Sequence, residues 1–183
     1  HGLLWDRDSR VIDYALRRRL KTLLDAEITL AAYHLALDAH PEVGNNALLA
    51  RELGVDPSER FAGVGFGGPL AEPATVEEFT ERVRVALGAE PLVFAHGPAR
   101  VERAAIVSGG AGGHLADAAR EGYDLFLTGE PKEPSLHTAR ELGIHFVAAG
   151  HYATERVGVQ ALARRLSERF DLEWEFIDLP NPV

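Results

Sequence analysis

Two histidine–carboxylate pairs with the same spacing are the residues of this sequence best suited to chemistry. They are His34 with Asp38 and His151 with Glu155, and the second pair follows the first at a constant offset of 117 residues. Each pair comes after an apolar run that ends in two alanines and one further residue. An imidazole nitrogen beside a carboxylate oxygen is a combination that borderline divalent metals bind. The repetition therefore predicts a pseudo-symmetric fold in which two strand ends bring these groups to one cleft.

Two single residues are expected at the same edge of the fold as the pairs. His1 stands at what looks like the end of a strand, and Glu130 follows an apolar strand pattern. Ligands of α/β proteins bind beyond the carboxyl ends of the strands. Two interpretations stay open for every one of these groups: a metal ligand, or a hydrogen-bonded structural residue such as a carboxylate at a helix N-terminus. The repeated spacing favours the metal ligand for the pairs.

A glycine-rich loop at 108–113 separates a predicted strand from a predicted helix. The loop does not fit the Gly-x-Gly-x-x-Gly pattern and has no Walker lysine. A tight turn is therefore favoured over an anion site at the helix N-terminus. The other histidines are expected at the surface or at the rim of the site, and the first two of the following are candidates to contact its ligands: His114, His137, His40, His96 and His145.

Composition disfavours several classes of protein. The 183 residues carry a net charge of −9 and no cysteine, so there are no disulfides and no thiolate metal site, and a cytoplasmic location is expected. No apolar stretch approaches the about 20 residues of a membrane span. An acidic chain is a poor partner for nucleic acid, and the basic cluster 17–19 is explained as the solvated face of a helix. The chain opens at His1 without methionine, and we expect that its native N-terminus is missing.

Alternating helix and strand patterns predict an α/β protein with mixed sheets. Asn45 or Asn46 is expected to cap the second helix, and Thr75 with Glu78 has the spacing of a capping box. Helices are expected at 11–24, 47–53, 75–87, 115–121, 135–142 and 155–170, and strands at 27–33, 91–95, 103–107, 123–127, 144–149 and 173–177.

A segment rich in glycine and proline indicates where two lobes would meet. Residues 61–74 are expected to hold a short strand at most. A boundary there leaves the remainder of a first α/β lobe at 1–70 and a second α/β lobe at 71–183, with the metal cleft between them.

Several long motifs resemble those of the GTP cyclohydrolase I type 2 homologue family, also called the Nif-three-like family. The resemblance covers essentially the whole chain, and motifs of this length leave little room for chance. They are H-G-L-L-W at 1–5, H-L-A-L-D-A-H-P-E-V-G-N-N at 34–46, S-G-G-A-G-G at 108–113, D-L-F-L-T-G-E at 124–130, G-H-Y-A-T-E-R at 150–156 and F-I-D-L-P-N-P at 176–182.

The resemblance implies two interlinked α/β lobes built from a structural repeat, with two divalent metal ions in the cleft between them. The first histidine of the family's His-His-Gly motif and the strands that open the first lobe are absent from this sequence. Glu155 is expected to bridge the two ions, which lower the pKa of bound water. Glu130 is expected to act as a general base or to hydrogen-bond a water on the metal. The metal ligands implied by the motifs are His1, Asp38, His151 and Glu155.

The function that the resemblance implies is metal-dependent hydrolysis of a nucleotide- or pterin-like small molecule. It also implies a homo-oligomer in the form of a hexameric ring. Zn, Fe, Mn and Ni are not distinguished by the ligand types. The alternative is a non-catalytic, metal-binding and ring-forming module, and turnover on a panel of nucleotides separates the two.

Overall fold

The computed structural model describes residues 1–4 and 11–183, which form two compact units. Unit 1 is His1–Ala36 and unit 2 is Leu37–Val183. The boundary expected after residue 70 falls inside a strand of unit 2, so the compact units do not follow that division.

Unit 1 contains helix α1 (Tyr14–Asp25), which confirms the helix expected at 11–24. Its N-terminus is capped by Asp13, whose carboxylate accepts a 2.8 Å hydrogen bond from the Leu16 amide. The apolar side chains of α1 are not buried within the described residues. The short helix α2 (His34–Asp38) spans the division between the units.

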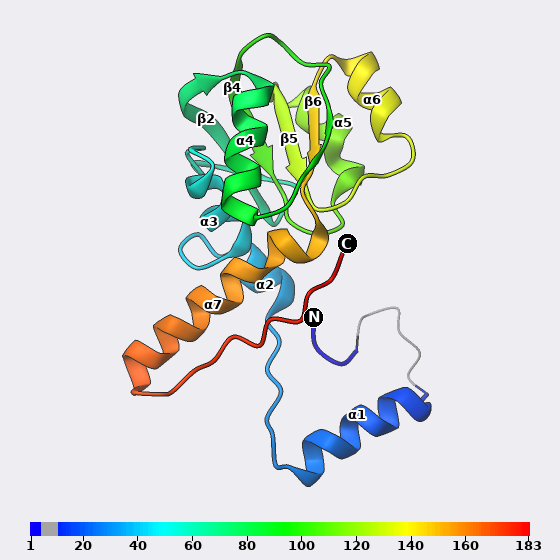
Figure 1. The fold of residues 1–183 in the computed structure, drawn as a ribbon, viewed down its shortest axis with the longest axis vertical. Helices are drawn as coiled ribbons and strands as arrows, with labels where there is room; N and C mark the ends of the chain where they lie inside the picture. The colour runs from blue at the N-terminus through cyan, green and yellow to red at the C-terminus, as the bar shows by residue number, and fades with distance from the viewer. Residues whose placement is uncertain (5–10) are drawn as a thin grey trace. The chain divides into compact units, whose positions relative to one another are not determined.

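Within the described residues, six strands of unit 2 form a single mixed sheet in the order β1-β2-β4-β5-β6-β3. Strands β2, β4, β5 and β6 can be followed across this sheet in Figure 1. The central strands β4, β5 and β6 run parallel, while β1, β2 and β3 pair antiparallel at the two edges. This arrangement confirms an α/β fold with a mixed sheet. The strands are β1 (Glu59–Phe61), β2 (Gly65–Ala74), β3 (Leu92–Phe94), β4 (Val101–Ile106), β5 (Leu125–Thr128) and β6 (His145–Ala148).

Helices cover both faces of the sheet. One face packs against α3 (Asn45–Glu52) and α4 (Val76–Leu87), and the other packs against α5 (Leu115–Arg120) and α6 (Ser135–Leu142). Alternate residues of each strand point into the two hydrophobic cores on either side of the sheet. In β4, for example, Ile106 packs in the core with α3 and α4, whereas Ala105 packs in the core with α5 and α6. Because both faces are covered, the paired parts of the parallel strands at 104–106, 125–127 and 146–148 are continuously apolar instead of alternating with polar residues. A 3₁₀ turn, η1 (Gly112–His114), leads into α5.

The start of α4 confirms the predicted capping box. The Thr75 hydroxyl accepts a 3.2 Å hydrogen bond from the Glu78 amide, and the Glu78 carboxylate accepts a 2.8 Å bond from the Thr75 amide. Two amides that a helix N-terminus leaves unpaired are thus satisfied by side chains. Gly88 ends the helix in the left-handed conformation, with φ of 68°.

Three expectations about strands are wrong. The segments 27–33 and 173–177 form no strand, because neither pairs with the sheet that the described residues build. Segment 61–74 instead contains β2, the longest strand, which lies between β1 and β4. Without a strand before α2, the first copy of the proposed repeat has a different element order from the second, so the repeat is not confirmed.

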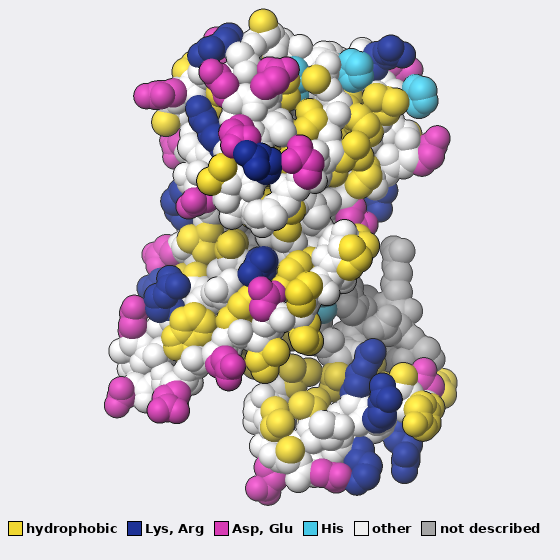
Figure 2. Space-filling view, in the orientation of Figure 1, with side chains coloured by type: hydrophobic (Ala, Val, Ile, Leu, Met, Phe, Trp, Pro, Cys, Tyr) yellow, Lys and Arg dark blue, Asp and Glu magenta, His cyan; other side chains and the backbone are white. Residues whose placement is uncertain are grey.

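No helix in the described part of the chain is both long and apolar enough to span a membrane. Hydrophobic side chains are nevertheless exposed along α7 (His151–Phe170) and the segment that follows it (Figure 2). That segment is held to α7 by a 2.7 Å contact between Arg156 and Asp178 and by a 2.9 Å hydrogen bond from the Tyr152 amide to the Val183 carbonyl.

Candidate functional site

The start of helix α7 brings the second histidine–carboxylate pair onto one face. Strand β6 ends at Ala148, and Gly150, with φ of 93°, turns the chain so that His151 is the first helical residue. Glu155 lies one helical turn further along the same face. The Nε2 atom of His151 is 3.2 Å from Oε2 of Glu155. The helix was expected to begin at residue 155, but it begins at His151. Both members of the pair therefore lie in the helix and are held more rigidly than they would be in a loop.

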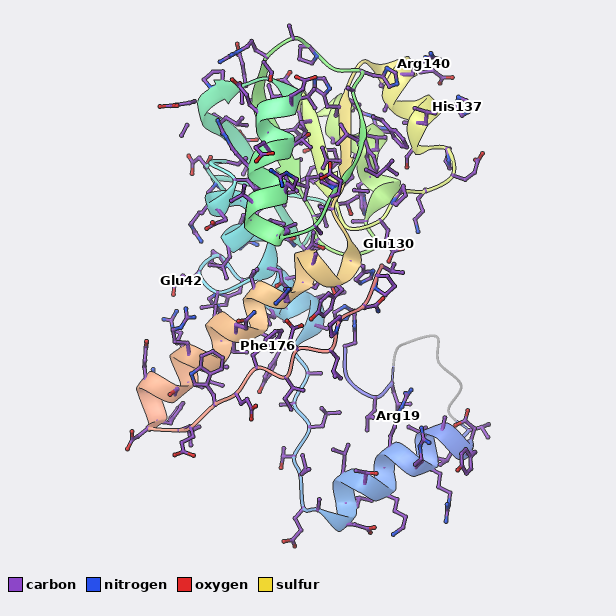
Figure 3. The ribbon with its side chains drawn as sticks, in the orientation of Figure 1. Arg19, Glu42, Glu130, His137, Arg140 and Phe176 are labelled. Atoms are coloured by element: carbon purple, nitrogen blue, oxygen red, sulfur yellow. The ribbon has the colours of Figure 1, made fainter. Side chains whose placement is uncertain are left out.

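The carboxylate of Glu130 contacts the other side of the His151 ring. Glu130 follows β5, which runs parallel to β6, so both residues lie beyond the C-terminal ends of neighbouring strands. Glu130 lies beside the first turn of α7 (Figure 3), and its Oε1 contacts Nδ1 of His151. The imidazole is therefore held between two carboxylates, one at each nitrogen.

Asp38 is tied to helix α7 through a single buried asparagine. The Asp38 side chain, 5% exposed, accepts a 2.7 Å hydrogen bond from Nδ2 of Asn45. The amide oxygen of Asn45 in turn accepts a 2.7 Å bond from the backbone N–H of Gly158. Any Cβ at Gly158 would lie 2.8 Å from that oxygen, so the close approach of the helix requires glycine. Asn45 thus sets the position of Asp38 relative to α7.

Burial raises the pKa of Glu155 above its ordinary value, His151 lowers it, and the negative charge of Asp38 raises it further. The net direction is upward, so the ionised form of Glu155 is held at a cost in free energy. Two neighbouring carboxylates inside the protein repel each other, and a bound cation would relieve that repulsion. The donor types present suit a borderline divalent metal.

The glycine-rich loop lies directly against these side chains. Gly109 has φ of 66°, and an added Cβ would lie 2.1 Å from Oε1 of Glu155 and 3.1 Å from Nε2 of His151. The Gly109 amide donates a 3.0 Å hydrogen bond to Thr154, and its carbonyl accepts bonds from the amides of Gly129 and Glu130. The Gly109 amide is therefore hydrogen-bonded within the protein, and the absence of a side chain at Gly109 leaves room for Glu155 and His151.

Replacement of Gly109 by alanine is expected to disrupt the site more than the fold. The left-handed backbone costs about 1–2 kcal/mol with a Cβ present, and the new methyl group must displace Glu155. Thermal unfolding without metal and divalent-metal titration measure the two effects. Gly113→Ala is the matched control, since a Cβ there meets nothing within 4 Å. Wild-type metal affinity in Gly109→Ala would contradict this account of the loop.

Sequence reasoning missed the buried asparagines. The N-cap of α3 is Gly44, so the capping role expected for Asn45 or Asn46 is wrong. Asn46 is fully buried; its oxygen accepts a 2.6 Å bond from the Ser108 amide, and its Nδ2 donates a 2.9 Å bond to the Val64 carbonyl. The polar Asn-Asn pair directly before an apolar helix is the signal that was available. It fits internal hydrogen bonding as well as it fits capping.

The other histidines have separate positions. His1 and His34 belong to unit 1, where their rings meet edge to face with centroids 4.5 Å apart. His114 contacts Asp117 at 3.1 Å, and His137 is exposed on α6. His145 was expected at the surface or rim, which is wrong. It is 4% exposed and joins the Pro98 carbonyl at 2.8 Å.

Comparisons with other sequences give a consistent family assignment. Residues 1–182 match the family described as Duf34/NIF3 (NGG1p interacting factor 3). A Pseudomonas aeruginosa protein named GTP cyclohydrolase 1 type 2 homolog is 49% identical over 188 residues, covering 100% of this chain and 74% of the relative. A protein of the same name from Escherichia coli (strain K12) is 46% identical over 184 residues, with the same two coverages.

Solved structures agree with the sequence comparisons. The structure of protein ybgI, described as of unknown function, has a TM-score of 0.93 and 45% identity, covering 98% of this chain and 73% of that one. TTHA1606 from Thermus thermophilus has a TM-score of 0.90 and 40% identity, with the same coverages. Sequence and fold together place this chain in the Duf34/NIF3 family, whose curated members here are named GTP cyclohydrolase 1 type 2 homologs.

Proposed function

We propose that this protein is a metal-dependent hydrolase of a nucleotide- or pterin-like small molecule. The observation that carries the proposal is the environment of Glu155. This largely buried carboxylate has a raised pKa, feels the charge of Asp38 and has an imidazole nitrogen of His151 at 3.2 Å. Two carboxylates and an imidazole are a donor set for a divalent cation, which would offset the repulsion between them. The residues therefore fit the metal that the family resemblance implies.

In unit 2, the proposed ligands are Asp38, His151 and Glu155. His1 is the fourth proposed ligand, because the motif H-G-L-L-W at 1–5 resembles the family's His-His-Gly motif. Two divalent ions at such a site would supply Lewis acidity and acidify bound water. Glu155 is the proposed bridging carboxylate because it lies beside His151 and is influenced by Asp38.

We assign Glu130 the task of orienting His151 rather than that of a general base. Its oxygen contacts Nδ1 of His151, so a proton on Nδ1 is shared with the carboxylate. The lone pair of Nε2 is then left on the side of Glu155, where a metal would bind. Carboxylates in this position fix the tautomer of a ligand histidine and raise its basicity.

The substrate class and the assembly are part of the same proposal. The shared name of the relatives, GTP cyclohydrolase 1 type 2 homolog, supports a nucleotide- or pterin-like substrate. A hexameric ring follows from the family resemblance, and a cytoplasmic location from the absence of cysteine.

Metal content and turnover test the proposal together. Elemental analysis of the purified protein is expected to give divalent metal that His151→Ala loses and that His114→Ala retains. Turnover is then measured on GTP, other nucleotides and pterins. Absence of metal binding by the wild-type protein would overturn the proposal. Full metal occupancy without turnover on any of these compounds would replace it with the non-catalytic, ring-forming module.

A further inference from the structure

A pocket of about 350 Å³ is lined in part by Glu130, the residue whose carboxylate contacts His151. Its floor is made where β5 and β6 end and α7 begins, and consists of small residues such as Ala149 and Ala153. Glu90, from the connection between α4 and β3, and Leu92, the first residue of β3, form one wall, and Asn181–Val183 form another. The volume lies at the small end of the range for small-molecule sites.

The charge of the pocket is one-sided. Its lining includes the carboxylates of Glu90 and Glu130 and the amide of Asn181, and no lysine or arginine is among the lining residues that the structure describes. A phosphate group would meet negative charge without a cation to offset it. A flat neutral heterocycle would instead lie against the small apolar floor and offer its N–H groups to a carboxylate, which only accepts hydrogen bonds when ionised.

Glu90 is the carboxylate positioned to hydrogen-bond such a ligand. Glu130 already contacts His151, whereas Glu90 lines the same pocket and is exposed. Guanine and pterin rings share an edge on which a ring N–H and an exocyclic amino group point the same way. A single carboxylate can accept both hydrogen bonds at once, and bonds to an ionised acceptor are stronger than neutral ones.

We propose that this pocket binds the heterocyclic end of a guanine- or pterin-type ligand through Glu90, and that phosphate groups are not held there. The proposal deepens the proposed function, because it places the base beside the orienting residue Glu130. Its binding test does not need metal. Failure of metal binding and failure of base recognition are therefore separate results.

The probes are guanosine, inosine, GTP and inorganic phosphate, titrated by calorimetry into the whole protein in the presence of a chelator. Guanosine is expected to bind at one site per chain, at least about tenfold more tightly than inosine, which lacks the amino group. GTP is expected to bind no more tightly than guanosine, and phosphate is expected not to compete. Glu90→Gln should weaken guanosine about tenfold or more, whereas Glu141→Gln, on the exposed surface of α6, should not.

Three results would overturn the proposal. They are the absence of guanosine binding by the wild-type protein, equal affinity for guanosine and inosine, and tighter binding of GTP than of guanosine without metal. Ala89→Phe adds an independent check, since Ala89 lines the pocket and is not among the proposed metal ligands. A phenylalanine there should block guanosine while leaving divalent-metal titration as in the wild type. Retained guanosine affinity in a folded Ala89→Phe protein would place the base elsewhere.

Discussion

Replacement of Glu155 by glutamine is expected to make the metal-free protein more stable and to impair its metal binding. The carboxylate is held at a raised pKa by burial and by Asp38, so removing its charge removes a cost in the folded state. The same charge is what two cations would share. Metal affinity should therefore fall by more than the about 10–100-fold that loss of a group supporting a ligand costs.

The sign of the stability change depends on pH. At pH values below the ordinary pKa of 4.5, Glu155 is protonated in both folded and unfolded states, and the variant should gain nothing. As the pH rises through the raised folded pKa, the wild type alone loses stability, so the advantage of Glu155→Gln should appear. Thermal unfolding with a chelator between pH 4 and 8 measures this trend.

Two comparisons sharpen the Glu155 experiment. Glu168→Gln changes an exposed carboxylate on the same helix and should alter neither property. Asp38→Asn should weaken mainly one of the two proposed ions, whereas Glu155→Gln should weaken both together. The stoichiometry of metal binding, measured by calorimetry, distinguishes these patterns. A wild-type stoichiometry in Glu155→Gln would contradict the bridging role.

Replacement of Asn45 by alanine is expected to damage stability and metal binding together. The change leaves the Asp38 carboxylate and the Gly158 amide without the 2.7 Å hydrogen bonds that Asn45 makes to each. A buried group without its partner costs about 1–3 kcal/mol. Metal affinity should fall about 10–100-fold, because Asp38 is no longer positioned.

Chemical unfolding and metal titration of Asn45→Ala are compared with Glu52→Ala, a change at an exposed residue of the same helix. Glu52→Ala should be close to wild type in both measurements. If Asn45→Ala loses stability but binds metal with wild-type affinity, Asn45 holds the fold together without positioning the site.

Local patterns were enough to predict the centre of the sheet. The apolar runs of β4, β5 and β6 and the capping box of α4 depend on neighbouring residues, and each formed where expected. Strand β2 was missed because its Gly and Pro content signals a turn, whereas its pairing with β1 and β4 satisfies the backbone. The segments 27–33 and 173–177 have strand-like sequences, but a strand also requires a neighbour.

The candidate site was predicted by residue type but not by geometry. The spacing of His151 and Glu155 was visible, and a helix makes it a contact. The roles of Asn45 and Gly109 depend on approaches between segments far apart in the sequence, and no local pattern encodes them. The contact from Glu130 to His151 likewise depends on the parallel register of β5 and β6.

The hydrogen bond from Gly158 to Asn45 joins residues 113 positions apart. During synthesis, α3 can make this contact only after nearly all of unit 2 has left the ribosome. Contacts between such distant segments form slowly in folding, because a long loop must close first. We therefore expect the proposed metal site at Asp38 and α7 to form only on completion of the chain, so that a truncated or stalled nascent chain would bind the proposed ion poorly.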